Sequence, residues 1–267
     1  MALTRRGRLR KALAVPFPEA WRDLLAEEFA HWRVLPGQER ESLERLIRLL
    51  LVDKHWEASR GFELTDGIRV VISAMASLPI LGLDYDYYHR VTSIIVAPTT
   101  VVLEGDRHVG GGLYTEEPLP IVGEASPDGP VLVAWDEARA QARDPGDGRN
   151  VVYHEFAHKL DMLGGSVDGT PPLESHAEYR RWVRVCNAEF EALRDGTGGD
   201  LLDPYGAENT GEFFAVVTEV FFCRPLQLER EKPELYAVFR DFYRQDPAAR
   251  ERRVDDPPWW ARPSSVD

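Results

Sequence analysis

The 267-residue chain contains little cysteine and no long hydrophobic run. Its two cysteines, Cys186 and Cys223, lie far apart in apolar helical patterns, which excludes a disulfide framework and predicts buried free thiols in a reducing compartment. The longest apolar stretch, 68–83, is interrupted by polar residues and is shorter than a membrane-spanning helix. The apolar run 12–17 is too short for a signal peptide. We therefore expect a cytoplasmic protein with no membrane segment.

Positive charge is also scarce. The sequence has 32 Lys and Arg against 45 Asp and Glu, so its net charge is -13 and its pI is near 5.1. Such a surface repels phosphate backbones and anionic lipid headgroups, which excludes nucleic acid as the main ligand. The basic stretch 4–11 is short, and we interpret it as a solvated arm. The remaining composition, 43% hydrophobic and 29% charged, is typical of a globular protein.

Apolar periodicity predicts many helices and few strands. Apolar residues at three- and four-residue steps predict helices over 18–35, 39–56, from about 150 to Gly164, 175–193, 210–222 and 233–243, and one that starts after Thr65. Short β-branched or apolar runs at 92–103, 119–122 and 130–135, separated by turns, predict strands. We therefore predict an α+β fold, mostly helical with a small mixed sheet. Its parts would be an N-terminal helical portion (1–65), a catalytic domain (66–250) and a C-terminal tail (251–267).

The chemistry concentrates in the HExxH sequence His154-Glu155-Phe156-Ala157-His158. Two histidines four residues apart on a helix present their imidazoles on one face and can fill two corners of a tetrahedral zinc site. Glu155 follows the first histidine directly, so its carboxylate can act as the general base toward water at the metal. The alternative is a pair of hydrogen-bonded core histidines. It would bury polar groups in an otherwise apolar helix without a purpose.

A catalytic zinc needs a third protein ligand. No histidine follows Gly164-Gly165 at short spacing, so we expect a carboxylate from the helix NTGEFFAVVTEVFF. Glu212 and Glu219 are seven residues apart there and share one helix face. Glu212 could instead close a capping box with Asn209, whereas Glu219 would otherwise be a buried unpaired carboxylate. Spacing alone leaves the two glutamates level.

Two segments carry a resemblance to a known family: HEFAHKLD at 154–161 and YGAENTGEFFAVVTEVFF at 205–222, with looser agreement at GPVLVAWDEA (129–138). The chain resembles zinc peptidases of the Mlc titration factor A type, gluzincins whose metal site is also similar to that of anthrax lethal factor. The resemblance extends over most of the chain and implies a zincin-like domain with one Zn²⁺. It also implies that Glu212 binds zinc and that Tyr205 faces the metal, where its hydroxyl would donate to the oxyanion. Tyr205 could alternatively be a turn tyrosine that covers the core.

Two further carboxylates could support the imidazoles. Asp161 is three residues from His158, lies on the metal face, and could accept a ring proton. Pairing with Lys159 or Arg149 is the alternative. Glu219 could support an imidazole in the same way. Lethal factor carries its second glutamate four residues after the ligand, where Val216 stands here. The remaining histidines receive no role: His31, His55, His89, His108 and His176.

The function predicted from these residues is zinc-dependent hydrolysis of peptide bonds in a peptide or protein substrate, and the resemblance implies aminopeptidase-like activity. The strand at 130–135, directly before the active-site helix, is the expected edge for an extended peptide. The alternative is a regulatory protein, because the namesake of the family sequesters a transcriptional repressor of sugar uptake. A purely structural zinc would need Glu219 as a fourth ligand.

Overall fold

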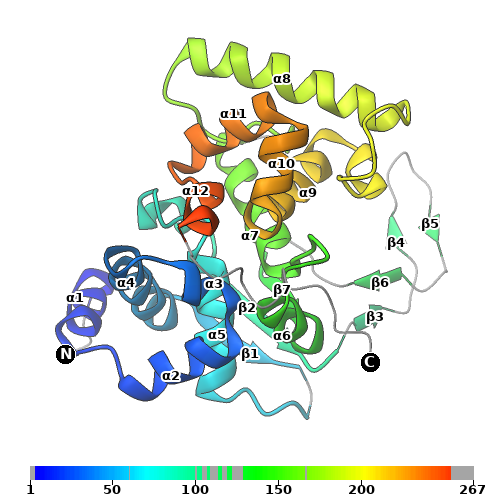
Figure 1. The fold of residues 1–267 in the computed structure, drawn as a ribbon. Helices are drawn as coiled ribbons and strands as arrows, with labels where there is room; N and C mark the ends of the chain where they lie inside the picture. Colours follow the sequence, from blue (N-terminus) through cyan, green and yellow to red (C-terminus); the bar gives the residue numbers. More distant parts are fainter. Residues whose placement is uncertain are drawn as a thin grey trace, which may run out of the picture.

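A small parallel sheet lies at the centre of the molecule (Figure 1). The computed structural model describes residues 4–59, 61–99, 101–103, 107–108, 114–115, 119–121, 129–165 and 167–253. Three parallel strands pair in the order β1 (His55–Ala58), β2 (Ser93–Ala97) and β7 (Val131–Ala134), with Ile94 opposite both Trp56 and Val131. Two antiparallel pairs are separate from it: β3 (Val101–Leu103) with β6 (Leu119–Ile121), and β4 (Arg107–His108) with β5 (Tyr114–Thr115). The predicted α+β class is confirmed.

The first third of the chain is helical around this sheet, as predicted. Its elements are α1 (Arg5–Ala14), α2 (Glu19–Glu28), α3 (Ala30–Val34), α4 (Gly37–Asp53), α5 (Asp66–Ser77) and the 3-10 turn η1 (Tyr85–Tyr88). The single helix expected over 18–35 is wrong, because Phe29 adopts an extended backbone and is wholly buried between α2 and α3. The helix expected over 39–56 ends at Asp53, and Trp56 lies in β1. The helix predicted to start after Thr65 is confirmed as α5, and Thr65 caps it by accepting a hydrogen bond from the backbone N–H of Ile68.

The basic segment 4–11 is not a solvated arm but the start of α1, which packs on α4. Arg5 pairs with the buried Asp53 at 2.6 Å, and Lys54 and Tyr85 donate to the same carboxylate at 2.8 and 2.9 Å. Burial raises the pKa of Asp53, but these three hydrogen bonds outweigh it and hold the pKa well below its ordinary value. The ion cluster therefore anchors α1 to α4 in the charged state of Asp53.

The second half of the chain supplies the helices that carry the motif residues. They are α6 (Trp135–Arg143), α7 (Val151–Asp161), η2 (Met162–Gly164), α8 (His176–Arg194), η3 (Pro204–Ala207), α9 (Thr210–Cys223), α10 (Pro225–Glu231), α11 (Pro233–Tyr243) and α12 (Pro247–Arg252). The predicted helices near 150–164, 175–193, 210–222 and 233–243 are confirmed. The strand at 130–135 is confirmed as β7, but α6 separates it from α7, so it does not directly precede the active-site helix.

Helices α7 and α9 lie side by side and antiparallel (Figure 1). Asn150, at the start of α7, meets Glu219 near the end of α9, while Asp161, at the end of α7, lies beside Gly211 at the start of α9. In Figure 1, α7 runs between the N-terminal helices, drawn in blue and cyan, and the α8–α11 group, drawn in yellow and orange. This helix pair places the motif residues of distant sequence segments face to face.

One buried hydrophobic cluster runs from Phe17 to Ala248, through both the predicted N-terminal portion and the predicted catalytic domain. The division at residue 65 stays a prediction, and most of the predicted tail lies outside the described residues. Cys186 and Cys223 are free and buried, as predicted. None of the helices in the described part of the chain combines the length and apolarity that crossing a membrane requires.

Candidate metal centre

Two side chains hold the start of helix α7: its own cap residue and a glutamine of α6. Asn150 caps it by accepting from the backbone N–H of Tyr153 at 3.0 Å, and Gln141 on α6 accepts from Val151 at 2.7 Å. These bonds satisfy N–H groups that a helix leaves without intrahelical partners. The first turn of α7 is thus fixed against α6, immediately before the two histidines. The contribution of Gln141 could not be found from sequence, because the cap crosses from another helix.

Helix α9 begins with the cap that the sequence suggested. The Asn209 side chain accepts from the backbone N–H of Glu212 at 3.0 Å. The Glu212 carboxylate does not turn back toward Asn209, as a capping box would require. It lies against the two imidazoles of α7 instead. The residue is therefore held by its backbone at the helix start while its side chain is available to the site.

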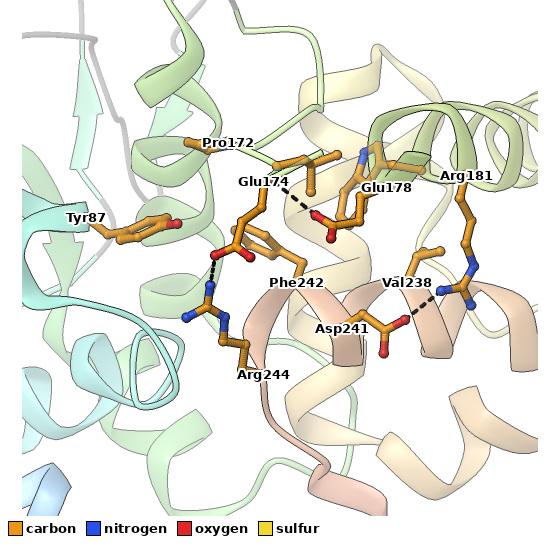
Figure 2. A pocket seen from close by; sticks show the side chains of 11 residues that line it. Tyr87, Pro172, Glu174, Glu178, Arg181, Val238, Asp241, Phe242 and Arg244 are labelled. Atoms are coloured by element: carbon orange, nitrogen blue, oxygen red, sulfur yellow. Dashed lines mark hydrogen bonds and ion pairs between the residues drawn. The ribbon is translucent and has the colours of Figure 1, made fainter. Parts of the chain in front are cut away.

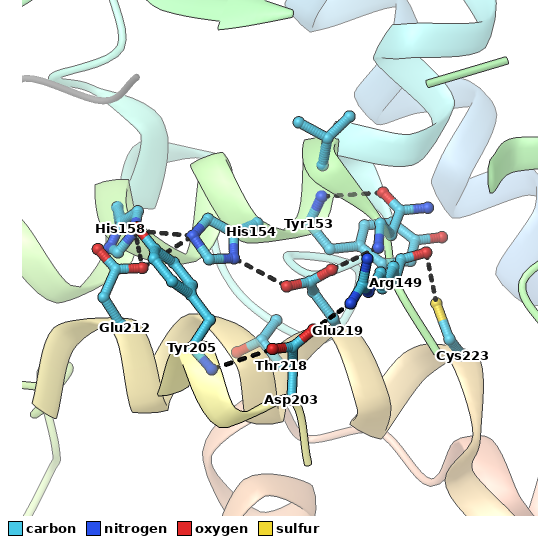
Figure 3. Close-up of polar contacts among 12 residues, drawn as sticks. Arg149, Tyr153, His154, His158, Asp203, Tyr205, Glu212, Thr218, Glu219 and Cys223 are labelled. Atoms are coloured by element: carbon cyan, nitrogen blue, oxygen red, sulfur yellow. Dashed lines mark hydrogen bonds and ion pairs between the residues drawn. The ribbon is translucent and has the colours of Figure 1, made fainter. Parts of the chain in front are cut away.

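Three donor atoms from α7 and α9 converge at one point (Figure 3). His154 Nε2 lies 3.0 Å from Glu212 Oε2, His158 Nε2 lies 3.2 Å from His154 Nε2, and His158 Nε2 lies 3.4 Å from Glu212 Oε2. His158 is buried and the other two side chains are largely so. Histidine nitrogen and carboxylate oxygen are the donors that Zn²⁺ takes in catalytic sites.

The electrostatics of the convergence point favour positive charge. Burial lowers the pKa of His154, but hydrogen bonds to Glu212 and Glu219 outweigh it and raise the pKa to about 10. Burial raises the pKa of Glu212, but the two imidazoles outweigh it and hold the pKa at about 2. The site therefore keeps its carboxylate ionised and binds a positive charge, which a metal ion would also supply.

Glu155 and Tyr205 border the same point. Glu155 is almost fully buried, and this burial raises the pKa of its carboxyl group to about 7. One of its oxygens has no hydrogen-bond partner among the described residues. The Tyr205 ring lies 6.1 Å from the ring of His154, and 46% of the residue is exposed. Burial, and secondly the charge of Glu212, raises the pKa of Tyr205 to about 12, so its hydroxyl keeps its proton. Figure 3 shows the ring rising toward Glu212 and the two histidines.

Tyr205 is positioned by a residue that the sequence analysis missed. Asp203 accepts from the backbone N–H of Tyr205 at 3.0 Å and pairs with Arg149 at 2.5 Å. The sequence Asp203-Pro204 is typical of a helix start, with the aspartate as cap and proline at the first position. That signal was available and predicts the short turn η3.

Glu219 contacts the ring of His154 from the side opposite Glu212. One carboxylate oxygen lies 2.8 Å from His154 Nδ1, and the other accepts from the backbone N–H of Asn150 at 2.5 Å. Glu219 thus joins the first turn of α7 to the imidazole. It lies beside His154 Nδ1 and not at the convergence point of the three donor atoms.

Asp161 is fully buried, but within the described part of the chain it forms no hydrogen bond with an imidazole. Its Oδ2 accepts from the backbone N–H of Gly169 at 3.0 Å, and its Oδ1 and His158 Nδ1 have no partner among the described residues. Burial is the largest cause that raises the pKa of Asp161 to about 6. Of the two alternative partners, Arg149 pairs with Asp203, and Lys159 donates to the backbone carbonyl of Gly129 at 2.9 Å. The role of Asp161 beside the histidines stays a prediction.

A cleft of about 680 Å³ opens from His154 and Glu155 along the start of α7 and the end of α9. A second pocket of about 200 Å³ lies elsewhere, over Trp182 and Phe242 (Figure 2). Four of the charged groups around this second pocket form ion pairs, Arg181 with Asp241 at 2.6 Å and Arg244 with Glu174, and the fifth, Glu178, accepts from the backbone N–H of Glu174. The cleft at the histidines is therefore the better candidate for substrate binding.

Comparison with known proteins agrees with this geometry. A family model described as glucose-regulated metallo-peptidase M90 matches residues 2–244. The chain belongs to the M90 family. An M90 chain is a metallopeptidase and thus a hydrolase, and the resemblance predicted from the motifs is confirmed.

The individual relatives cover most of this M90 chain. Mlc titration factor A of Serratia proteamaculans is 32% identical over 247 residues, which are 86% of this chain and 92% of that protein. Mlc titration factor A of Edwardsiella ictaluri is 32% identical over 244 residues, covering 88% and 89%. An uncharacterized protein of Synechocystis sp. is 35% identical over 236 residues, covering 87% and 86%.

Proposed function

We propose that the chain hydrolyses peptide bonds with one Zn²⁺ ion held by His154, His158 and Glu212. The triangle of donor atoms, with sides of 3.0, 3.2 and 3.4 Å, carries the proposal. A tetrahedral Zn²⁺ with ligands at about 2.0–2.1 Å separates its donor atoms by about 3.3 Å. Two imidazole nitrogens that face each other at 3.2 Å also need a cation or a proton between them, because their lone pairs repel. The residues therefore fit the metal.

When bound there, Zn²⁺ would polarise a substrate carbonyl and lower the pKa of an adjacent water molecule. Glu155 is the general base: its carboxylate takes a proton from the attacking water and passes it to the leaving amine. Its burial beside the two imidazoles holds the carboxylate in a dry position from which it can reach a water molecule at the metal position. Tyr205 donates its hydroxyl hydrogen to the oxyanion that forms on the substrate carbonyl. Its raised pKa keeps that hydrogen in place.

Glu219 orients His154 in this proposal. The carboxylate accepts the Nδ1 proton of the ring, which leaves Nε2 as the nitrogen that faces the metal position. Asp161 is the second carboxylate that we propose near the histidines. Its burial and its proximity to His158 support a role in the electrostatics of that ring.

The substrate is proposed to be an extended peptide with a free amino terminus. The motif resemblance supports aminopeptidase-like cleavage. Strand β7 lies at the edge of its three-stranded sheet and supports binding of a peptide as an added strand. We also propose a cytoplasmic location, which is supported by the two buried free thiols.

The test combines metal content with chelator-sensitive hydrolysis of aminoacyl and internally quenched peptides, for the wild type and Glu155→Gln. We expect about one zinc per chain in both proteins, and cleavage by the wild type alone, with a loss of at least about 100-fold in the variant. A wild type that binds zinc and cleaves no peptide would contradict the proposal.

A second candidate function is binding and sequestration of a transcriptional repressor, with hydrolysis secondary. It is supported by relatives of about 30% identity that carry the name Mlc titration factor A. The same Glu155→Gln variant separates the two functions. A repressor-binding function predicts unchanged affinity for the partner in this variant, because the substitution leaves the surface of the protein nearly unaltered.

A further inference from the structure

The cleft beside the histidines ends at an arginine. Both His154 and Arg224 line this cleft of about 680 Å³. Arg224 is the residue at which α9 ends, five residues beyond Glu219. A helix rises about 1.5 Å per residue, which places Arg224 about 18 Å along the axis from Glu212. An extended peptide advances about 3.3 Å per residue, so about 18 Å corresponds to about five residues. The arginine and substrate side chains bridge part of this distance, so a substrate side chain about two to five residues from the scissile bond can reach the arginine.

The Arg224 side chain is built into the cleft wall. Its stem packs on Gly148, where a Cβ atom would lie 2.8 Å from Arg224 Cδ and 3.8 Å from Nη1. Gly148 also has φ +85, a conformation that residues with side chains rarely adopt. The glycine therefore makes room for the arginine, which as a residue is only half-buried.

The Arg224 guanidinium has no directly paired carboxylate among the described residues, although the charge of Glu231 acts on it from a distance. The other arginine of the cleft, Arg149, pairs with Asp203 at 2.5 Å. No residue in the described part of the chain forms a hydrogen bond or a close ion pair with the Arg224 guanidinium. A guanidinium presents five donors in a planar fork that matches a carboxylate.

We propose that Arg224 binds a substrate carboxylate, either an acidic side chain or the C-terminal carboxylate of a short peptide, and thereby sets the specificity of the cleft. This inference rests on the proposed peptidase function of the same site. The group that Arg224 recognises lies on the part of the peptide that extends from the metal position toward the end of α9.

Six acidic residues line the cleft, and three of them are already engaged: Asp203 pairs with Arg149, Glu219 contacts His154, and Glu155 borders the metal position. The other three, Glu137, Asp147 and Asp200, would favour a cationic group. Asp147 and Asp200 are exposed, so solvent and salt screen their charges. Glu137 is partly buried near the start of α6, and its backbone N–H is not available to a substrate charge because it donates to Asp136. The half-buried and unpaired Arg224 is therefore the stronger anchor.

The experiment uses alanine pentapeptides with a free amino terminus. In one set, which is amidated at the C-terminus, each peptide carries a single Glu, Gln or Lys at one of the second to fifth positions. A second set consists of two all-alanine peptides, one with a free C-terminus and one amidated. Specificity constants are measured for zinc-loaded wild type, Arg224→Gln, Arg224→Glu and the control Arg230→Gln, an exposed arginine on α10 outside the cleft. Binding of the same peptides to Glu155→Gln, alone and combined with Arg224→Gln, is measured by calorimetry.

We expect the wild type to prefer at least one carboxylate peptide over its neutral match by about 10-fold, through lower KM. Arg224→Gln should reduce this ratio to within about twofold, and Arg224→Glu should invert it toward lysine, while Arg230→Gln keeps it. The position of the preferred glutamate, or the free C-terminus, identifies the source of the carboxylate.

Equal use of Glu and Gln peptides, a preference for lysine in the wild type, or an equal loss for all peptides in Arg224→Gln would overturn the inference. If the wild type cleaves no peptide, the proposed function fails. The calorimetry then decides the inference by itself, through the presence or absence of a carboxylate preference that depends on Arg224.

Discussion

Replacing Glu219 with glutamine should weaken zinc binding, although the two side chains have the same shape. Two N–H donors point at the two oxygens of Glu219: the Nδ1–H of His154 at 2.8 Å and the backbone N–H of Asn150 at 2.5 Å. Glutamine offers one oxygen and one NH₂ group. Whichever way it turns, one donor faces another donor.

The loss of zinc affinity can be estimated from this one unmatched N–H donor. A buried donor left without an acceptor costs about 1–3 kcal/mol, and Glu219 is largely buried. If the cost falls on the orientation of His154, the dissociation constant for zinc rises by about 10- to 100-fold, which is the range found when carboxylates that support metal-bound histidines are removed.

The assay is competition for zinc against a chelator of known affinity at pH 7, with circular dichroism to verify folding. Glu234→Gln is the control, because Glu234 is exposed and its ion pair with Arg184 lies at the surface. A zinc affinity of Glu219→Gln within about twofold of wild type, in a folded protein, would refute the role assigned to Glu219.

Two further predictions concern the hydroxyl of Tyr205 and the charge of Asp53. Tyr205→Phe should lower kcat by about 100-fold and leave KM and zinc content unchanged, because the hydroxyl acts on the oxyanion alone; a parallel change in zinc content would contradict this. Asp53→Asn should lower the free energy of unfolding at pH 7 by about 3 kcal/mol, measured by urea denaturation. The folded-state pKa of Asp53 lies below the unfolded value near 3.9, so its contribution is present above that pH and is lost as the pH falls below it. The stability difference between wild type and Asp53→Asn should therefore shrink below about pH 4, and a constant difference would show that the charge is not responsible.

The helices with strong apolar periodicity were predictable from the sequence, but the interruption of the predicted helix 18–35 at Phe29 was not. The caps of α5, α7 and α9 are local signals: Thr65, Asn150 and Asn209 each stand at the start of a predicted helix and accept a bond from its first turn. The break at Phe29 has no local signal. It arises because Phe29 is buried and because Glu28 pairs with Arg139 on α6, a partner 111 residues away.

The three donor residues of the centre were predictable for a different reason. A helix fixes the relation of His154 to His158, because residues four apart share a face. No such rule relates α7 to α9, so the position of Glu212 came from family resemblance. The Asp203–Arg149 pair and the cap from Gln141 join separate elements, and the sequence does not encode their proximity in any spacing.

From spacing alone, either Glu212 or Glu219 was expected to be the third ligand of the metal. In the structure both contact His154. The antiparallel packing of α7 and α9 brings Glu212 to 3.0 Å from Nε2 of His154 and Glu219 to 2.8 Å from Nδ1 of the same ring. One imidazole therefore spans two carboxylates that stand two helical turns apart on one face. Only Glu212 also reaches His158, so the two glutamates differ in what else they touch: the second imidazole for Glu212, and the start of α7 for Glu219. Seven-residue spacing on α9 is thus the spacing needed to hold a single histidine from both sides.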